Sequence, residues 1–125
     1  MADASAAVSA LLRDGPARAR LGAELIHAPH LIDFEVASAI RHNVLDGHLR
    51  AVHGEHALAR WSRTALERYP AGGLLTRIWE LRRSLSTYDA AYVALAEALA
   101  CPLLTADGRL ASAPHLRCEV QVVPR

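Results

Sequence analysis

Residues 87–110, TYDAAYVALAEALACPLLTADGRL, predict a helix, a short apolar strand and a turn, with one carboxylate at each junction. Asp89 falls in the first turn of the helix, just after Ser86 and Thr87, and either hydroxyl can cap the helix N-terminus. From Asp89, small apolar residues continue along one helix face: Val93, Ala96 and Ala100. The pattern predicts a helix packed against a core, with Asp89 at its beginning.

The end of the same stretch predicts a buried strand. Pro102 prevents the helix from continuing, and residues 103–105 form a short apolar run that ends at the turn pair beginning with Asp107. In a parallel α/β sheet, ligands bind where strands end and the following helices begin. We therefore expect Asp89 and Asp107 at the same edge of the sheet.

Two further acids occupy equivalent junctions earlier in the chain. Asp3 precedes a predicted helix over residues 4–12 and can cap it. Glu35 lies in the first turn of a predicted helix over residues 34–45, for which Asp33 is the expected cap. All four acids are thus expected at one edge of one sheet.

The remaining segments predict the fold class. Strands are expected at 26–28, 64–69 and 119–123 in addition to 103–105, and further helices at 17–25, 51–63 and 74–85, with a short turn or helix at 108–113. Gly47 is expected to end the helix over 34–45. Strands that alternate with helices predict an α/β fold with a central, mainly parallel sheet flanked by helices. A chain of 125 residues is expected to form one domain over 1–125.

Composition narrows the functional classes. Apolar residues make up 52% of the chain, as in a globular protein, and 14 basic against 13 acidic residues give no strongly basic surface. Every basic side chain other than histidine is arginine, so phosphate loops and receiver sites that need a lysine are excluded. Cys101 and Cys118 suit a reducing cytoplasm as unbridged residues. No apolar run reaches the length of a membrane span, so we expect a cytoplasmic protein without membrane contact.

Each of the four acids also has a local explanation. Asp3 and Asp89 can serve helix N-termini, Glu35 can offset a helix dipole, and Asp107 with Gly108 is a common turn pair. Together, however, four carboxylates at one edge would repel one another unless a cation lay among them. Oxygen ligands without cysteine or histidine suit Mg²⁺ or Mn²⁺, which can activate a water for phosphoryl displacement. The sequence therefore predicts a metal site for hydrolysis.

Four blocks of this sequence resemble the PIN-domain nucleases, and among them the VapC-like toxins of bacterial toxin–antitoxin pairs. The blocks are Asp3-Ala4-Ser5-Ala6, Glu35-Val36-Ala37-Ser38-Ala39, the longer STYDAAYVALA at residues 86–96, and Leu104-Thr105-Ala106-Asp107. The long block is fairly specific, whereas the others are weak alone. The resemblance covers essentially the whole chain and is loosest over residues 51–73.

The resemblance implies a three-layer PIN-like fold and a metal-dependent endoribonuclease acting as a toxin. It implies that Asp3, Glu35, Asp89 and Asp107 are both catalytic residues and ligands of Mg²⁺ or Mn²⁺. Thr105 matches the hydroxyl of the family near the site. The implied partners are an RNA substrate (tRNA, rRNA or mRNA), a VapB-like antitoxin and a second copy of the chain, in a homodimer and a toxin–antitoxin hetero-oligomer.

One departure from the family pattern leaves alternatives open. Such proteins usually begin with several apolar residues that form a central strand, whereas only Met1 and Ala2 precede Asp3 here, so the strand is very short or residues are missing. A PIN-like scaffold that binds RNA or protein with weak catalysis is one alternative. The others are a solitary RNA-processing nuclease and a structure-specific DNA nuclease.

Other candidate residues favour structural roles. The pairs His27/His30 and His53/His56 are incomplete as metal sites, so we expect surface or packing histidines. Arg82 and Arg83 shortly precede Asp89. We expect them on a solvated face of a helix rather than in contact with substrate phosphates. Trp61 and Trp79 are expected in the core rather than as stacking platforms for bases.

Overall fold

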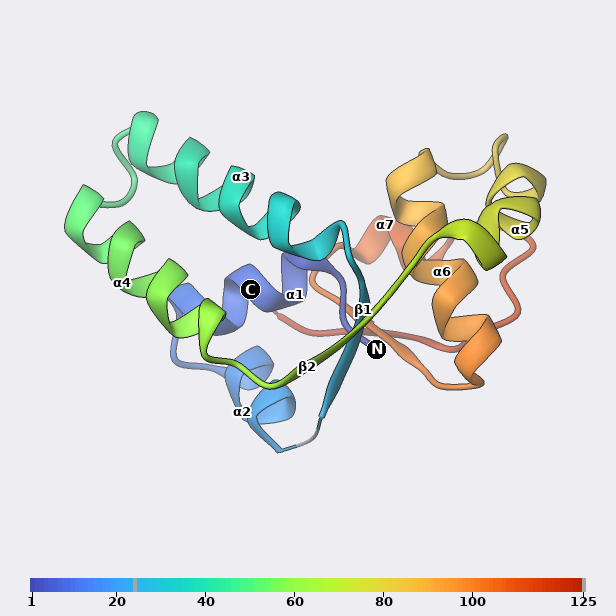
Figure 1. Ribbon diagram of the computed structural model, residues 1–125, viewed down its shortest axis with the longest axis horizontal. Helices are drawn as coiled ribbons and strands as arrows, with labels where there is room; N and C mark the ends of the chain where they lie inside the picture. Colours follow the sequence, from blue (N-terminus) through green and yellow to red (C-terminus); the bar gives the residue numbers. More distant parts are fainter. Residues whose placement is uncertain (24, 125) are drawn as a thin grey trace.

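The computed structural model describes residues 1–23 and 25–124, and Figure 1 shows its arrangement of helices and strands. The elements in chain order are α1 (Ala4–Leu12), α2 (Pro16–Gly22), β1 (Ile26–Pro29), α3 (Ile32–Leu45), α4 (Ala51–Ser62), β2 (Leu66–Tyr69), the 3₁₀ helix η1 (Gly72–Leu74), α5 (Leu75–Glu80), α6 (Thr87–Leu99), β3 (Leu103–Thr105), α7 (Gly108–Ala111) and β4 (Val120–Val122). The alternation confirms the predicted α/β class.

Helix α6 follows local sequence rules at both ends. The Ser86 hydroxyl accepts a hydrogen bond from the Asp89 N–H at 3.1 Å, so Ser86 rather than Thr87 is the cap. Ala100 adopts a left-handed conformation with φ 52° and ends the helix before Pro102. Between the ends, residues 90–96 are all buried, and four of these seven are alanines. Their small side chains let α6 pack closely against its neighbours.

The strands form parallel pairs that the N-terminal residues connect. Strand β1 pairs with β2, β3 pairs with β4, and Ala2 forms an isolated parallel bridge to Leu104. The Ala2 N–H donates to the His27 carbonyl at 3.3 Å, and the Asp3 N–H donates to the Leu104 carbonyl at 3.0 Å. Residues 1–3 therefore lie between β1 and β3 as the short central strand, with Asp3 directly at its end.

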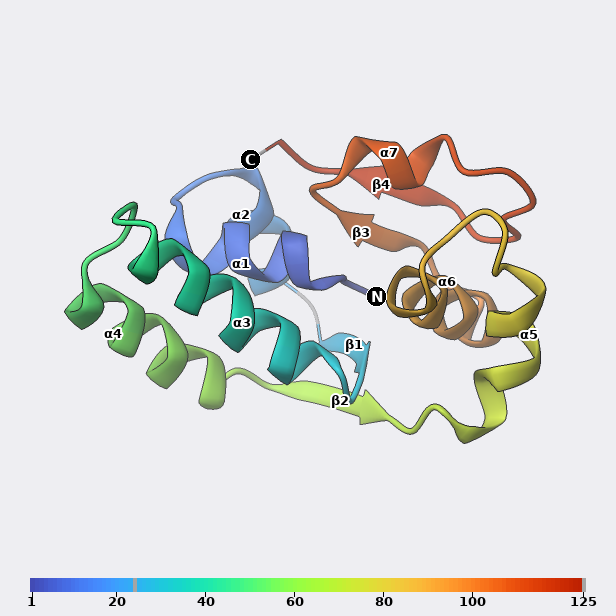
Figure 2. The ribbon, with the colours of Figure 1, turned by 90° about the horizontal axis from the view of Figure 1, so that it is seen from above.

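Helices cover both sides of these strands. Figures 1 and 2 show α1–α4 on one side of the strands and α5 and α6 on the other, which gives three layers. The main core joins α6 to α3 and α4 through residues such as Tyr92, Val36 and Trp61. A smaller core beneath α1 and α2 contains Ala2, Ile26 and Leu104. The first turns of α3 and α6 consequently lie at the same end of the strands as Asp3.

Some element boundaries differ from the prediction. Asp33 is not the cap of α3, because the helix begins at Ile32 and Asp33 lies within its first turn. The helix predicted over 74–85 is η1 followed by the short α5, and turns occupy residues 81–84. The helix predicted over 17–25 ends at Gly22, and its position 24 lies outside the described residues. In the part of the chain that the structure describes, no helix has both the length and the hydropathy needed to span a bilayer.

Candidate active site

Asp3 is held rigidly at the end of the central strand. Its side chain is almost fully buried, and its Oδ1 accepts hydrogen bonds from the Ala6 N–H at 3.0 Å and the Ser5 hydroxyl at 2.6 Å. The Thr105 hydroxyl, which is fully buried, donates to Oδ2 at 2.5 Å. Asp3 therefore caps α1 as predicted, and Thr105 lies beside it as the family resemblance implied.

Glu35 lies in the first turn of α3 and is fixed by a residue of α6. The Tyr92 hydroxyl donates to Glu35 Oε1 at 2.7 Å, and the Tyr92 side chain is 2% exposed. Proximity to the Glu35 carboxylate and burial both raise the pKa of Tyr92, with burial as the larger cause. The phenol therefore keeps its proton and remains a donor to Glu35.

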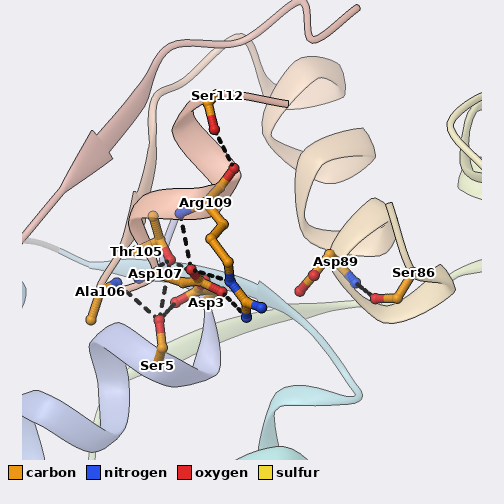
Figure 3. A network of polar contacts seen from close by, with 9 residues as sticks. All are labelled: Asp3, Ser5, Ser86, Asp89, Thr105, Ala106, Asp107, Arg109 and Ser112. Atoms are coloured by element: carbon orange, nitrogen blue, oxygen red, sulfur yellow. Dashed lines mark hydrogen bonds and ion pairs between the residues drawn. The ribbon is translucent and has the colours of Figure 1, made fainter. Parts of the chain in front are cut away.

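Asp89 and Asp107 complete the set of four predicted acids, which we call the acidic site. Asp89 is half-buried at the beginning of α6, and no described residue donates a hydrogen bond to its carboxylate. The Asp107 N–H donates to Thr105 Oγ1 at 3.0 Å, so Thr105 connects Asp107 to Asp3. Figure 3 shows this network, with the Arg109 side chain reaching back to Asp107.

The charges of the acidic site act on one another. Burial is the main cause that raises the pKa of Asp3, and the Asp89 carboxylate raises it further, while hydrogen bonds from Ser5 and Thr105 oppose the shift. Burial also raises the pKa of Glu35 most, against the hydrogen bond from Tyr92, and the charges of Asp89 and Asp3 add to the increase. Asp3, Glu35 and Asp89 therefore form one electrostatically repelling group.

This group fits a hard divalent cation in chemistry and charge. All its donor atoms are carboxylate oxygens, and burial raises the pKa values of Asp3 and Glu35, so a bound cation would stabilise their charged forms. Among the described residues, however, no three acidic, histidine or cysteine side chains are grouped closely enough to hold a metal ion. Binding of a cation would therefore require movement of the acids around the firmly held Asp3.

A groove of about 400 Å³ between α1 and α3 opens beside the acidic site. Glu35 and Ser5 line its end, and the remaining lining includes Val8, Ala39 and Asn43. Small side chains on both helices leave this space open. The groove can accommodate a flexible segment of a bound molecule next to Glu35.

Some contributors were not found from the sequence. Ser5 and Tyr92 belong to the blocks that resemble the family, but the sequence indicated no role for them. In the structure, each donates a hydrogen bond directly to a predicted acid. Tyr92 lies three residues after Asp89 and thus on the same helix face, which was a usable signal. Arg109, the partner of Asp107, was not considered. Its contact depends on the local turn at α7.

The other candidates are partly confirmed. Trp61 is buried and donates its indole N–H to Asp33 Oδ1 at 2.8 Å, as expected for a core residue. The expectation for Trp79 was wrong, because its side chain is 67% exposed and lies under the Arg82 guanidinium at 4.6 Å. His27 lies 2.7 Å from the Tyr69 hydroxyl, through Nδ1, and so contributes to the contact between β1 and β2. Cys101 and Cys118 are not bridged.

Residues 1–116 match the PIN domain family. The chain is 54% identical over 123 residues to Ribonuclease VapC9 of Mycobacterium tuberculosis, covering 98% of this chain and 97% of the relative. It is 42% identical over 126 residues to Ribonuclease VapC1 of the same organism, covering 97% and 95%. The crystal structure of PAE2754 from Pyrobaculum aerophilum matches with a TM-score of 0.69 and 22% identity, covering 95% and 80%, which supports the fold alone.

Proposed function

The chain belongs to the PIN-domain family, and we propose that Asp3, Glu35, Asp89 and Asp107 form the metal site at which it cleaves RNA. By its family it is a ribonuclease toxin of the VapC type and a metal-dependent hydrolase. The four acids would hold Mg²⁺ or Mn²⁺. When bound, this cation supplies the charge that activates the attacking water and offsets the charge of the phosphodiester.

The residues of the chain have distinct roles in this proposal. Ser5 and Thr105 hold both oxygens of Asp3, so its carboxylate is positioned before any ligand arrives. Tyr92 holds one oxygen of Glu35 and leaves the other available. The Asp89 carboxylate accepts no hydrogen bond from a described residue, so it can orient a water molecule for attack on phosphorus.

The observation that carries the proposal is the convergence of three carboxylates from distant segments of the chain. Besides burial, the charge of Asp89 raises the pKa of Asp3, and the charges of Asp89 and Asp3 raise the pKa of Glu35. A fold that only needed helix caps would have no reason to gather them. Substrate phosphates are also anions, so RNA binding at this site requires a cation in addition to the protein.

The test is cleavage of total cellular RNA with and without Mg²⁺. Wild type should cleave only with the metal, and Asp89→Asn should be at least about a hundredfold slower, because a lost ligand costs several kcal/mol at the transition state. Asp46→Asn is a matched control, since Asp46 is an exposed acid at the end of α3. Cleavage that persists in EDTA, or that Asp89→Asn leaves intact, would contradict the proposal.

The scaffold alternative gains no support from the short first strand. Although only Met1 and Ala2 precede Asp3, backbone hydrogen bonds to His27 and Leu104 fix this segment between β1 and β3. The same experiment decides between the readings. RNA binding without metal-dependent cleavage by wild type would favour the scaffold.

We further propose that a VapB-like antitoxin inhibits the acidic site. An antitoxin arginine could fork onto two of the carboxylates, and the groove beside Glu35 offers space for the adjoining segment. Glu35→Lys should then weaken binding of the antitoxin as well as catalysis. Co-purification with the product of a neighbouring small reading frame tests the partner, and harmless overexpression without such a frame would favour a solitary RNA-processing nuclease.

We also propose a homodimer of this single domain in the cytoplasm. Large apolar side chains are strongly exposed on the described surface, among them Phe34 at 79%, Trp79 at 67% and Leu45 at 65%. Exposed apolar side chains of this size often mark protein interfaces. Light scattering over a concentration series tests the dimer, and a monomer at every concentration would contradict it.

A further inference from the structure

Arg109 places a positive charge directly on the acidic site. Its guanidinium forks onto Asp107, with Nε 3.1 Å from Oδ1 and Nη2 2.8 Å from Oδ2. The Arg109 backbone N–H also donates to Oδ1 at 3.0 Å. Among the salt bridges within residues 1–23 and 25–124, no other joins an arginine to one of the four acids.

The ion pair is open to exchange. The Arg109 side chain is 91% exposed and that of Asp107 is 26% exposed. Pairs exposed to this degree contribute little to stability, because water and salt screen them. A divalent cation carries twice the charge and can bind several carboxylates at once, so it can take Asp107 from the guanidinium.

A released Arg109 would remain at the mouth of the site. Figure 3 shows its side chain extending from α7 over Asp107, with the guanidinium on the side toward Asp89. The Asp107 carboxylate raises the pKa of Arg109, and the charge of Asp89 adds to the increase. RNA must approach an acidic surface here, and a planar guanidinium binds phosphate oxygens at two points.

We propose that Arg109 exchanges partners: it holds Asp107 in the metal-free protein and binds the RNA backbone phosphate once a divalent cation has taken that carboxylate. This inference rests on the metal-dependent ribonuclease function proposed above. One exposed side chain thus pairs with Asp107 in the metal-free protein and recruits the anionic substrate in the metal-bound protein.

Calorimetric titration with Mn²⁺ tests the first half. Arg109→Gln should bind Mn²⁺ about two- to fivefold more tightly than wild type, because the guanidinium that competes with Mn²⁺ for Asp107 is lost. Arg109→Lys, which keeps the charge but not the fork, should fall between them. Arg63→Gln is the control for net charge, because Arg63 is exposed and precedes β2, at the opposite end of the strands.

Kinetics with a short RNA at saturating Mn²⁺ tests the second half. Arg109→Gln should raise KM without a comparable fall in kcat, and Arg109→Lys should restore part of the affinity. Mn²⁺ affinity that is unchanged or weaker in Arg109→Gln, or an unchanged KM, overturns this proposal while leaving the ribonuclease function in place. A wild type that neither binds Mn²⁺ nor cleaves RNA overturns both.

Discussion

In the proposed metal site, Tyr92 orients the carboxylate of Glu35. It is buried, so its hydrogen bond to Glu35 at 2.7 Å is shielded from water. Groups that orient a metal ligand typically contribute tenfold or more to metal affinity. Tyr92→Phe removes the hydroxyl and keeps the ring, and therefore isolates this contribution from the packing of α6.

We expect Tyr92→Phe to bind Mn²⁺ about tenfold more weakly and to lose about 1 kcal/mol of stability. Titration calorimetry and urea unfolding measure the two effects. Tyr88→Phe is the matched control, because Tyr88 lies on the same helix but is 63% exposed. Equal Mn²⁺ affinity in wild type and Tyr92→Phe would show that Glu35 needs no such support.

At the scale of elements, the α3–α4 pair depends on a glycine. A Cβ at Gly54 would lie 2.9 Å from Val44 Cγ2 and 3.2 Å from Ile40 Cγ2, both on α3. Gly54→Ala should therefore destabilise the protein by about 1 kcal/mol, because overpacking outweighs the gain in helix propensity. In Gly22→Ala the new Cβ meets nothing within 4 Å, so a higher melting temperature is expected there. If Gly54→Ala also has a higher melting temperature than wild type, α3 and α4 are packed loosely enough to accept the added methyl group.

Elements governed by neighbouring residues were predictable from the sequence. The cap at Ser86, the stop at Pro102 and the apolar run 103–105 act within a few residues, and the structure has the strand at Leu103–Thr105. Asp33 was misassigned because its role depends on distant partners. It accepts hydrogen bonds from Arg68 at 2.7 Å and Trp61 at 2.8 Å, which follow it by 35 and 28 positions. No local pattern indicates such contacts.

The acidic site shows the same division. Its four positions were predicted from the junctions of local elements, whereas Tyr92, Ser5 and Arg109 act through contacts that only the folded chain reveals.

Helix α5 was predicted too long for a related reason. Its last turn tightens where the Leu81 N–H bonds the carbonyls of residues 77 and 78, and Leu81 is buried there.

A partly buried ion pair links α5 and α6 to the loop between α7 and β4. The Arg77 guanidinium forks onto Glu97 at 2.7 and 3.1 Å, and the Arg117 N–H donates to the same carboxylate at 2.7 Å. Glu97→Gln should cost about 2 kcal/mol in urea unfolding, since Arg77 stays largely buried without its counter-charge. Glu80→Gln, at 3.9 Å and 50% exposed, should change stability by less than about 0.5 kcal/mol.

The same pair has a defined pH dependence. Burial raises the pKa of Glu97, but the hydrogen bonds from Arg77 and Arg117 outweigh it and leave the pKa lowered from 4.5. A lowered folded-state pKa gives stability that is present above the ordinary pKa and lost as pH falls. The difference in stability between wild type and Glu97→Gln should therefore shrink from pH 7 toward pH 3. A constant difference would mean that packing rather than charge dominates.

At the scale of the whole molecule, burial and repulsion of the carboxylates of Asp3, Glu35 and Asp89 oppose folding of the metal-free protein. These residues come from the central strand, α3 and α6, so their repulsion acts between segments far apart in the chain. The pKa values of Asp3 and Glu35 are raised in the folded state, chiefly by burial. For such groups, stability is fully present below the unfolded-state pKa and is lost as pH rises through the folded-state pKa.

The metal-free protein should therefore lose stability as pH rises above the ordinary pKa values of these groups, 3.8 for Asp3 and 4.5 for Glu35, and saturating Mg²⁺ should remove this loss. Above pH 5 the carboxylates with lowered pKa, Asp33 and Glu97, stay charged in both states and do not contribute to the slope. At a Mg²⁺ concentration of 100 times the Kd, binding to the native state alone adds about 2.7 kcal/mol. Melting temperatures at several pH values, with Mg²⁺ or with EDTA, measure both effects.

Glu35→Gln should flatten the dependence of metal-free stability on pH and reduce the stabilisation by Mg²⁺, because one repelling charge and one ligand disappear together. A metal-free stability that instead rises between pH 5 and 7, with no response to Mg²⁺, would mean that these carboxylates do not form a cation site.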